Sequence, residues 1–200
     1  MRGLYAVTPE TLTGPALYRA AEAACAGGAV LLQYRNKSCD IACRLADARA
    51  LRAITTVCGT RFIVNDDVEL AHEVGADGVH VGRDDGDPAA ARRRLGPAAV
   101  IGVSCYNDAG LAREARRAGA DYVAFGAMFA STTKPAAPVA DPARFAEVAD
   151  LGIARCAIGG ITLARAPALI EAGADLLAVV SDLFDTTDIS ARARAYAQLF

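Results

Sequence analysis

The sequence predicts one α/β domain, a single (β/α)₈ barrel (TIM barrel) that takes up residues 1–200. Two observations predict it: a phrase that recurs four times, and short apolar runs midway between its copies. The phrase reads GGAV from residue 27, GADGV from 75, GADYV from 119 and GADLL from 173. The copies stand about 45 to 55 residues apart, which suits two strand–helix units each.

Each copy of the phrase is expected to end one helix and begin one strand, because glycine adopts the positive φ that follows many helices. Four further strands lie between the copies, at 4–7, 62–64, 100–103 and 155–158. These runs are short, continuous and rich in Val, Ile and Ala, as expected of parallel strands covered on both faces. Helices are predicted over 15–26, 41–57, 111–118 and 164–172, with Pro15 in a first helical turn. A doubly wound open sheet is the alternative, but the early G-x-G-x-x-G turn that favours it is missing.

Composition limits the partners. A formal net charge of −2 argues against nonspecific binding to nucleic acid or to an anionic membrane surface. The one basic run, Arg92 to Arg94, fits the outer face of a helix. No apolar run approaches the roughly 18 residues that span a bilayer.

The cysteines and the first residues indicate a reducing compartment. The start MRGLYAVTP lacks the long apolar core of a signal peptide, so we expect a cytoplasmic protein with buried, reduced thiols. The six cysteines include no C-x-x-C pair, and only two histidines accompany them. The sequence therefore predicts no cysteine–histidine metal cluster.

Polar residues gather where the predicted strands end, which is where barrels of this kind place their chemistry. Following the strands in order, they are Gln33 to Lys37, Asn65 and Asp66, the stretch His80 to Asp85, Ser104, Ser131 to Lys134, Gly159 and Gly160, and Ser181. The opposite strand ends carry mainly Gly, Ala and Asp from the repeated phrase. One rim is therefore predicted to bind ligands, and the other to be structural.

The composition of this rim suits phosphorylated substrates. It holds three cations and three hydroxyls: Arg35, Lys37, Lys134, Ser131, Thr133 and Ser181. The adjacent glycines Gly159 and Gly160 let backbone amides approach a phosphate closely, although they also fit a simple tight turn. Asp66 and Asp85 come from neighbouring strands and could share Mg²⁺ with a phosphorylated substrate. The alternative for Asn65 and Asp66 is a helix cap.

These residues resemble the thiamine-phosphate synthase family. Its phrases occur in order from Leu4 to Ser181: LYAVT, QYRNK, VNDD, GADGVHVG, IGVSCYN, GADYVAFG, STTKP, AIGGIT and VVS. The resemblance implies a Mg²⁺-assisted transferase that joins hydroxymethylpyrimidine diphosphate to a thiazole phosphate and releases pyrophosphate. Because the rim supplies charge but few nucleophiles, a dissociative displacement is favoured.

The resemblance also implies residue roles. The pyrimidine diphosphate would be held by Gln33, Arg35, Lys37, Asn65, Ser104 and Lys134, of which Arg35, Lys37, Ser104 and Lys134 are the candidate catalytic residues. The thiazole phosphate would meet Ser131, Thr133, Gly159, Gly160, Val180 and Ser181. Asp66 and Asp85 match the Mg²⁺ ligands. The chain departs from the commonest family pattern at Asn36, Arg83 and Ser131, where glutamate, glutamine and threonine are frequent.

Other interpretations stay open at this point. A thiazole tautomerase-like barrel needs no diphosphate clamp, and a noncatalytic phosphate sensor would be expected to lose the charged residues that this chain keeps. Cys105 is expected to serve packing, and His80 to be a hydrogen-bonded structural histidine rather than a base. His72, on a helix, is expected to lie outside the chemistry. The apolar helix faces predict no particular oligomeric state.

Overall fold

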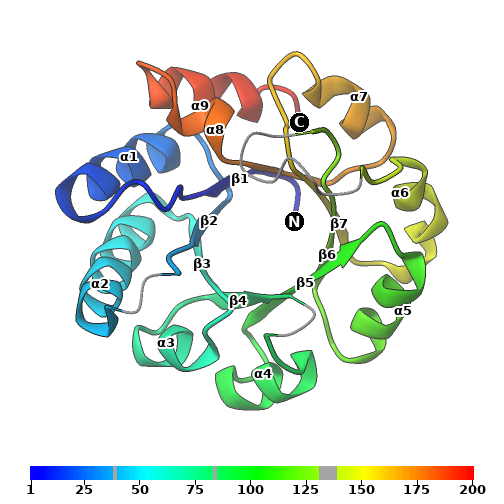
Figure 1. Cartoon of the computed structure of the whole chain (residues 1–200), viewed down its shortest axis with the longest axis horizontal. Coiled ribbons are helices and arrows are strands. Elements are labelled where there is room, and N and C mark those ends of the chain that lie inside the picture. Colours follow the sequence, from blue (N-terminus) through cyan, green and yellow to red (C-terminus); the bar gives the residue numbers. More distant parts are fainter. Residues whose placement is uncertain (38–39, 83–84, 131–138) are drawn as a thin grey trace.

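The computed structural model describes residues 1–37, 40–82, 85–130 and 139–200, and these form a closed barrel with helices outside it (Figure 1). Each strand pairs in parallel with the next, and β8 pairs with β1. The strands are β1 (Gly3–Val7), β2 (Leu31–Tyr34), β3 (Arg61–Asn65), β4 (Gly78–Val81), β5 (Val100–Tyr106), β6 (Tyr122–Phe125), β7 (Ala154–Ile158) and β8 (Leu176–Val179). The helices are α1 (Gly14–Ala26), α2 (Ile41–Cys58), α3 (Val68–Glu73), α4 (Pro88–Leu95), α5 (Ala109–Arg117), α6 (Ala143–Glu147), a 3₁₀ turn η1 (Ala149–Leu151), α7 (Ala166–Glu171), α8 (Ser181–Phe184) and α9 (Ile189–Ala197).

The predicted barrel is confirmed, and the open-sheet alternative is wrong. The largest error in the strand bounds concerns β5, which was expected to end at Val103 but runs to Tyr106. A register shift between Ser104 and Tyr106 keeps β5 paired with β6 over this extra length. Helix α7 is shorter than the predicted 164–172. Within the described residues, none of the helices is long and apolar enough to cross a membrane.

Side chains alternate between two core layers along each strand. In β1, Leu4 and Ala6 pack outward against the helices, whereas Tyr5 and Val7 point into the barrel. Tyr122 joins Tyr5 in the interior, where their rings meet edge to face with centroids 5.7 Å apart. The interior is therefore a packed core that contains two phenol hydroxyls.

The aspartates of the repeated phrase cap the starts of the strands, at the end of the barrel away from the predicted ligand-binding rim. Each accepts a hydrogen bond from a backbone N–H of the preceding strand and from an arginine, as seen for Asp77 with Phe62 and Arg52, Asp121 with Ile101 and Arg92, and Asp175 with Arg155 twice. Gly75, Gly119 and Gly173, two residues before these aspartates, have positive φ, which confirms the predicted helix ends. Arg92, expected on an outer helix face, thus pairs at the barrel end.

Replacing Asp175 by alanine is expected to lower the free energy of unfolding by about 1–3 kcal/mol, because the backbone N–H of Arg155 loses its acceptor. Asp175 is bonded to that N–H and to the Arg155 Nε at 2.9 Å each. Urea denaturation checks the loss. Asp150→Ala is the control, since Asp150 forms an exposed ion pair with Arg113 and its replacement should change stability little. Equal effects of the two substitutions would contradict the capping role.

The described cysteines are all free thiols, and Cys39 lies outside the described residues. Cys25, Cys105 and Cys156 are buried as predicted. The prediction is wrong for Cys58, which is exposed, and Cys43 is half-buried. Cys58 is the last residue of α2.

Candidate active site

An acidic pair stands where β3 and β4 end. Asp66 follows β3 with φ 64°, and its N–H donates to the backbone oxygen of His80 at 2.8 Å. Burial, and then the negative charge of Asp85, raise the pKa of Asp66, while Lys37 lowers it. The Lys37 Nζ lies 3.4 Å from an Asp66 carboxylate oxygen. Two carboxylates and one lysine therefore share this part of the rim.

The helix cap considered for Asn65 and Asp66 belongs instead to the next residue. Asp67 is the N-cap of α3, and its side chain accepts from the Leu70 N–H at 2.8 Å. Asp66 is left with its carboxylate toward Asp85 and Lys37, so the cap interpretation of Asn65 and Asp66 is wrong. A non-glycine residue at positive φ is uncommon and is tolerated best by Asn and Asp.

The acidic pair fits Mg²⁺ better than a metal held by the protein alone. Among the described residues, no group of three His, Cys, Asp or Glu side chains could hold a metal ion. Mg²⁺ is commonly bound by one or two carboxylates and completes its shell with water and substrate phosphates. Burial, and then the negative charge of Asp85, raise the pKa of Asp66, and a divalent cation beside the two carboxylates would favour their charged forms.

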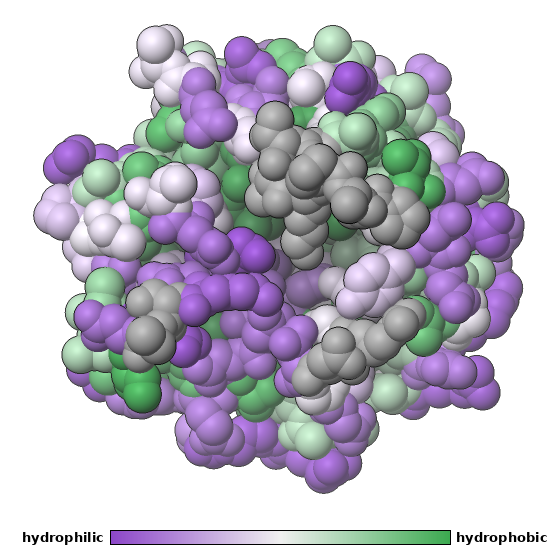
Figure 2. All heavy atoms as spheres, viewed as in Figure 1, coloured by the Kyte–Doolittle hydropathy of each residue, from purple (hydrophilic) through white to green (hydrophobic). Residues whose placement is uncertain are grey.

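The basic side of the rim lies just after β2. The backbone N–H of Arg35 donates to the Thr8 hydroxyl at 3.0 Å, and its guanidinium pairs with Glu10 at 2.6 Å. Lys37 is more than half exposed beside Asp66. The sequence alone did not identify Thr8 and Glu10, which follow β1, as partners of Arg35, because they lie far from it along the chain. Figure 2 shows hydrophilic side chains around the centre of the face that looks down the barrel axis.

A buried carboxylate is hydrogen-bonded to the end of β2, next to Arg35. Asp47, on α2, is 2 % exposed and accepts hydrogen bonds from the Tyr18 hydroxyl at 2.8 Å and from the Tyr34 hydroxyl at 3.4 Å. The Asn36 side chain in turn donates to the Tyr34 hydroxyl at 3.0 Å. Asn36, where the family commonly has glutamate, thus acts as a donor within a local network.

Three of the predicted pyrimidine-binding residues lie within strands instead of after them. Gln33 belongs to β2 and is 3 % exposed, Asn65 is the last residue of β3, and Ser104 belongs to β5. The Gln33 amide nitrogen donates to the Tyr5 hydroxyl at 2.7 Å. The Ser104 hydroxyl lies 2.9 Å from the His80 Nε2. Through these contacts, the side chains of Gln33 and Ser104 reach into the barrel interior.

His80 is hydrogen-bonded on both ring nitrogens, as predicted for a structural histidine. Its Nδ1 lies 2.9 Å from the Tyr122 hydroxyl, and burial lowers the pKa of His80 to about 4. Tyr5 and Tyr122 were missed as polar residues, because their sequence context reads as apolar strand. Cys105 donates weakly to a backbone oxygen, and burial raises the pKa of its thiol to about 12, in line with a packing role. His72 is exposed on α3.

The glycines after β7 leave their amides available. Gly159 and Gly160 have φ of 98° and 63°, and within the described ranges their N–H groups have no hydrogen-bond acceptor. Val180 and Ser181 follow β8, which pairs with β7 through Ile158 and Ala178. The two loops therefore stand side by side at one rim. The predicted residues Arg83, Ser131, Thr133 and Lys134 lie outside the described residues.

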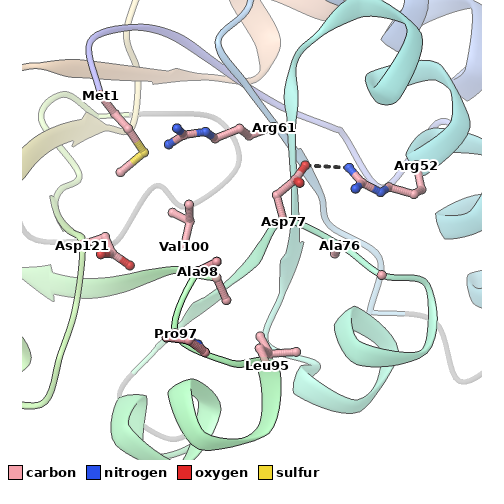
Figure 3. A pocket seen from close by; sticks show the side chains of 12 residues that line it. Met1, Arg52, Arg61, Ala76, Asp77, Leu95, Pro97, Ala98, Val100 and Asp121 are labelled. Atoms are coloured by element: carbon pink, nitrogen blue, oxygen red, sulfur yellow. Dashed lines mark hydrogen bonds and ion pairs between the residues drawn. The ribbon is translucent and has the colours of Figure 1, made fainter.

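A polar hollow of about 420 Å³ opens at the other end of the barrel. Figure 3 shows its lining, in which Asp77 points toward Arg52 and Arg61 lies nearby. The lining includes the starts of β3 and β5 and two of the capping aspartates, Asp77 and Asp121, and it contains none of the predicted site residues. The capping ion pairs described above account for the polar side chains in this hollow.

Comparison with known proteins identifies close relatives along the whole chain. The family model described as thiamine monophosphate synthase matches residues 4–183. The thiamine-phosphate synthase of Chromobacterium violaceum is 56% identical over 200 residues, covering 100% of this chain and 97% of that protein. The thiamine-phosphate synthase of an Azoarcus species is 54% identical, with coverage of 100% and 98%.

A solved structure agrees with these relatives. Thiamine phosphate pyrophosphorylase from Pyrococcus furiosus superposes with a TM-score of 0.88 at 29% identity, covering 98% of this chain and 94% of that chain. A 3-hexulose-6-phosphate synthase, at 18% identity and a TM-score of 0.70, shares the barrel fold alone.

Proposed function

The chain belongs to the thiamine-phosphate synthase family, and we propose that the barrel rim at the carboxyl ends of its strands carries out the family reaction by a dissociative, Mg²⁺-assisted displacement. The chain is a transferase. It condenses 4-amino-2-methyl-5-hydroxymethylpyrimidine diphosphate with a thiazole phosphate, giving thiamine monophosphate and pyrophosphate. The thiazole phosphate is 4-methyl-5-(2-phosphoethyl)thiazole or its carboxylated form, and with the carboxylated form the carboxyl group would leave as carbon dioxide.

The observation that carries the proposal is the facing of Asp66 and Asp85 with Lys37 alongside. Two carboxylates with one lysine keep a negative charge that a divalent cation would balance, and this suits a metal-bound diphosphate. Arg35 lies after the same strand as Lys37 and adds a planar guanidinium that can grip two phosphate oxygens. Lys134, which matches the family lysine on the diphosphate, is assigned on the resemblance only.

The chemistry needs one bond broken and one formed. The bond between the pyrimidine's exocyclic CH₂ and the diphosphate oxygen breaks, and its electron pair leaves with pyrophosphate. The aminopyrimidine carries the resulting positive charge until the thiazole nitrogen donates its lone pair to the CH₂. Bound Mg²⁺ supplies positive charge against the leaving group. Arg35 and Lys37 bind the same group, which is electrostatic catalysis by residues already in place.

The second substrate is positioned by its phosphate. The amides of Gly159 and Gly160 and the turn at Val180 and Ser181 are suited to bind that phosphate on one side of the mouth. Holding the thiazole there brings its nitrogen to the pyrimidine CH₂ and makes the attack effectively intramolecular. Ser131 and Thr133 are assigned to the same phosphate on the resemblance.

The test is product formation from the two substrates, with Mg²⁺ and with excess chelator. We expect thiamine phosphate and pyrophosphate in equal amounts, with the rate at least about tenfold lower in chelator. Restoring Mg²⁺ after chelation is the control for irreversible damage. Absence of product from folded protein that still binds thiazole phosphate would contradict the proposal and favour a tautomerase-like or sensor role.

A further inference from the structure

Four consecutive hydrogen bonds cross the barrel interior between two residues assigned to the pyrimidine. They run from Gln33 Nε2 to the Tyr5 hydroxyl at 2.7 Å, and from Tyr5 to the Tyr122 hydroxyl at 2.7 Å. They continue from Tyr122 to His80 Nδ1 at 2.9 Å, and from His80 Nε2 to the Ser104 hydroxyl at 2.9 Å. The five side chains come from β2, β1, β6, β4 and β5, so only the closed barrel brings them together.

Counting the protons shows that these four hydrogen bonds all run in one direction, from Gln33 to Ser104. The Tyr5 oxygen accepts from Gln33, and within the described chain the acceptor for the Tyr5 proton is the Tyr122 oxygen. Tyr122 then donates its own proton to His80 Nδ1, which must be unprotonated. The remaining imidazole proton sits on Nε2 and goes to Ser104. A protonated Nδ1 would leave the proton of either Tyr5 or Tyr122, both buried, without an acceptor among the described residues, and that is costly in a core.

Ring packing holds these hydrogen-bonded side chains in place. Tyr122 is fully buried, its ring stacks on the His80 ring with centroids 5.5 Å apart, and it meets Tyr5 edge to face. Gly102 is required beside it, because a Cβ at that position would overlap the Tyr122 ring. The hydroxyls therefore have little freedom to turn away from one another.

We propose that Tyr122 is a positioning residue that, through His80, holds the Ser104 hydroxyl as a hydrogen-bond donor to the pyrimidine substrate. Ser104 already accepts from His80, so its own proton is left for a ligand in the mouth. The ring nitrogens of an aminopyrimidine carry lone pairs that accept such a bond. This role rests on the proposed function, which places the pyrimidine next to Ser104.

The first test needs no substitution in the chain of hydrogen bonds. Imidazole ¹⁵N spectra of the full-length protein at neutral pH report which ring nitrogen carries the proton, and His72→Gln assigns the second of only two histidines. We expect His80 to be neutral and protonated on Nε2. A proton on Nδ1, or on both nitrogens, would overturn the proposal.

The second test asks whether Tyr122 acts through Ser104. In Tyr122→Phe we expect kcat/KM for the pyrimidine diphosphate to fall about tenfold, with KM for the thiazole phosphate unchanged. In a Ser104→Ala background, the same substitution should have no further effect on kcat/KM. Tyr196→Phe is the control, because it removes a buried phenol hydroxyl bonded to Asp182 outside the barrel interior.

The outcomes separate the two proposals. Multiplicative effects of Tyr122→Phe and Ser104→Ala, or equal losses for both substrates, would show a merely structural role and overturn the positioning role alone. A wild-type protein that forms no product in the same assay would overturn the proposed function and, with it, the substrate named here. Thermal unfolding of each variant establishes that the compared proteins are folded.

Discussion

Asp66→Asn is expected to lower kcat/KM for the pyrimidine diphosphate on the order of a thousandfold while the protein stays folded. The carboxylate would be one of two ligands for Mg²⁺, and asparagine keeps its size but not its charge. Asparagine is preferred to alanine here, because position 66 has φ 64° and asparagine tolerates that conformation. Steady-state kinetics over a range of Mg²⁺ concentrations measure the loss.

The neighbouring residue provides the matched control. Asp67→Asn makes the same chemical change one position along, and asparagine caps a helix about as well as aspartate. The variant loses the ion pair with Arg44, which lies at 2.6 Å, but no contact in the acidic pair. We expect near-normal turnover. Similar losses in both variants would point to a general electrostatic effect and contradict a ligand role specific to Asp66.

The stability of Asp66→Asn should change in the opposite direction from its activity. The folded-state pKa of Asp66 is raised above its ordinary value of 3.8, so ionising this group destabilises the metal-free fold. This cost is absent below that ordinary value and grows as the pH rises through the folded pKa. Without metal, the variant should therefore unfold at a higher temperature than wild type at neutral pH, and the difference should shrink on acidification. Added Mg²⁺ should raise the Tm of wild type more than that of the variant.

The barrel was predictable because its signals are local. Each glycine-rich copy marks one helix end, and the apolar runs between copies have the composition of doubly covered strands, so the order of elements follows without any long-range information. The identity of the capping residue was not predictable in the same way. Asn65, Asp66 and Asp67 all suit a cap, and it is the hydrogen bond from the Leu70 N–H to the Asp67 side chain that identifies Asp67 as the cap.

The interior hydrogen bonds were not predictable because they depend on closure of the barrel. Tyr5 and Tyr122 are 117 residues apart and stand in apolar strands, where a tyrosine is expected to pack. Which face each strand turns inward depends on register, and the register shift in β5 is not written in any local pattern. The charged rim was easier to find, because loop residues such as Arg35 and Lys37 have no packing role to explain them.

Gly160→Ala is expected to raise KM for the thiazole phosphate on the order of a hundredfold and to leave KM for the pyrimidine diphosphate much less affected. A Cβ at Gly160 would lie 2.8 Å from the Phe129 carbonyl oxygen and 2.9 Å from that of Ala130, so the backbone must shift. A shift of this loop moves the amides that are proposed to face the phosphate. Kinetics with each substrate varied separately measure the effect.

Gly152→Ala separates this displacement from backbone strain. Gly152 has φ 64°, almost the same as the 63° of Gly160, but nothing lies within 4 Å of the added Cβ. Both variants should therefore lose about 1–2 kcal/mol of stability from the left-handed conformation, and only Gly160→Ala should lose affinity for the substrate. Binding of the unphosphorylated thiazole alcohol sharpens the comparison, because Gly160→Ala should weaken it far less than the phosphate. If Gly160→Ala weakened the binding of the thiazole alcohol and of the thiazole phosphate equally, the glycines would serve only as a tight turn. The phosphate would then be held by other parts of the rim.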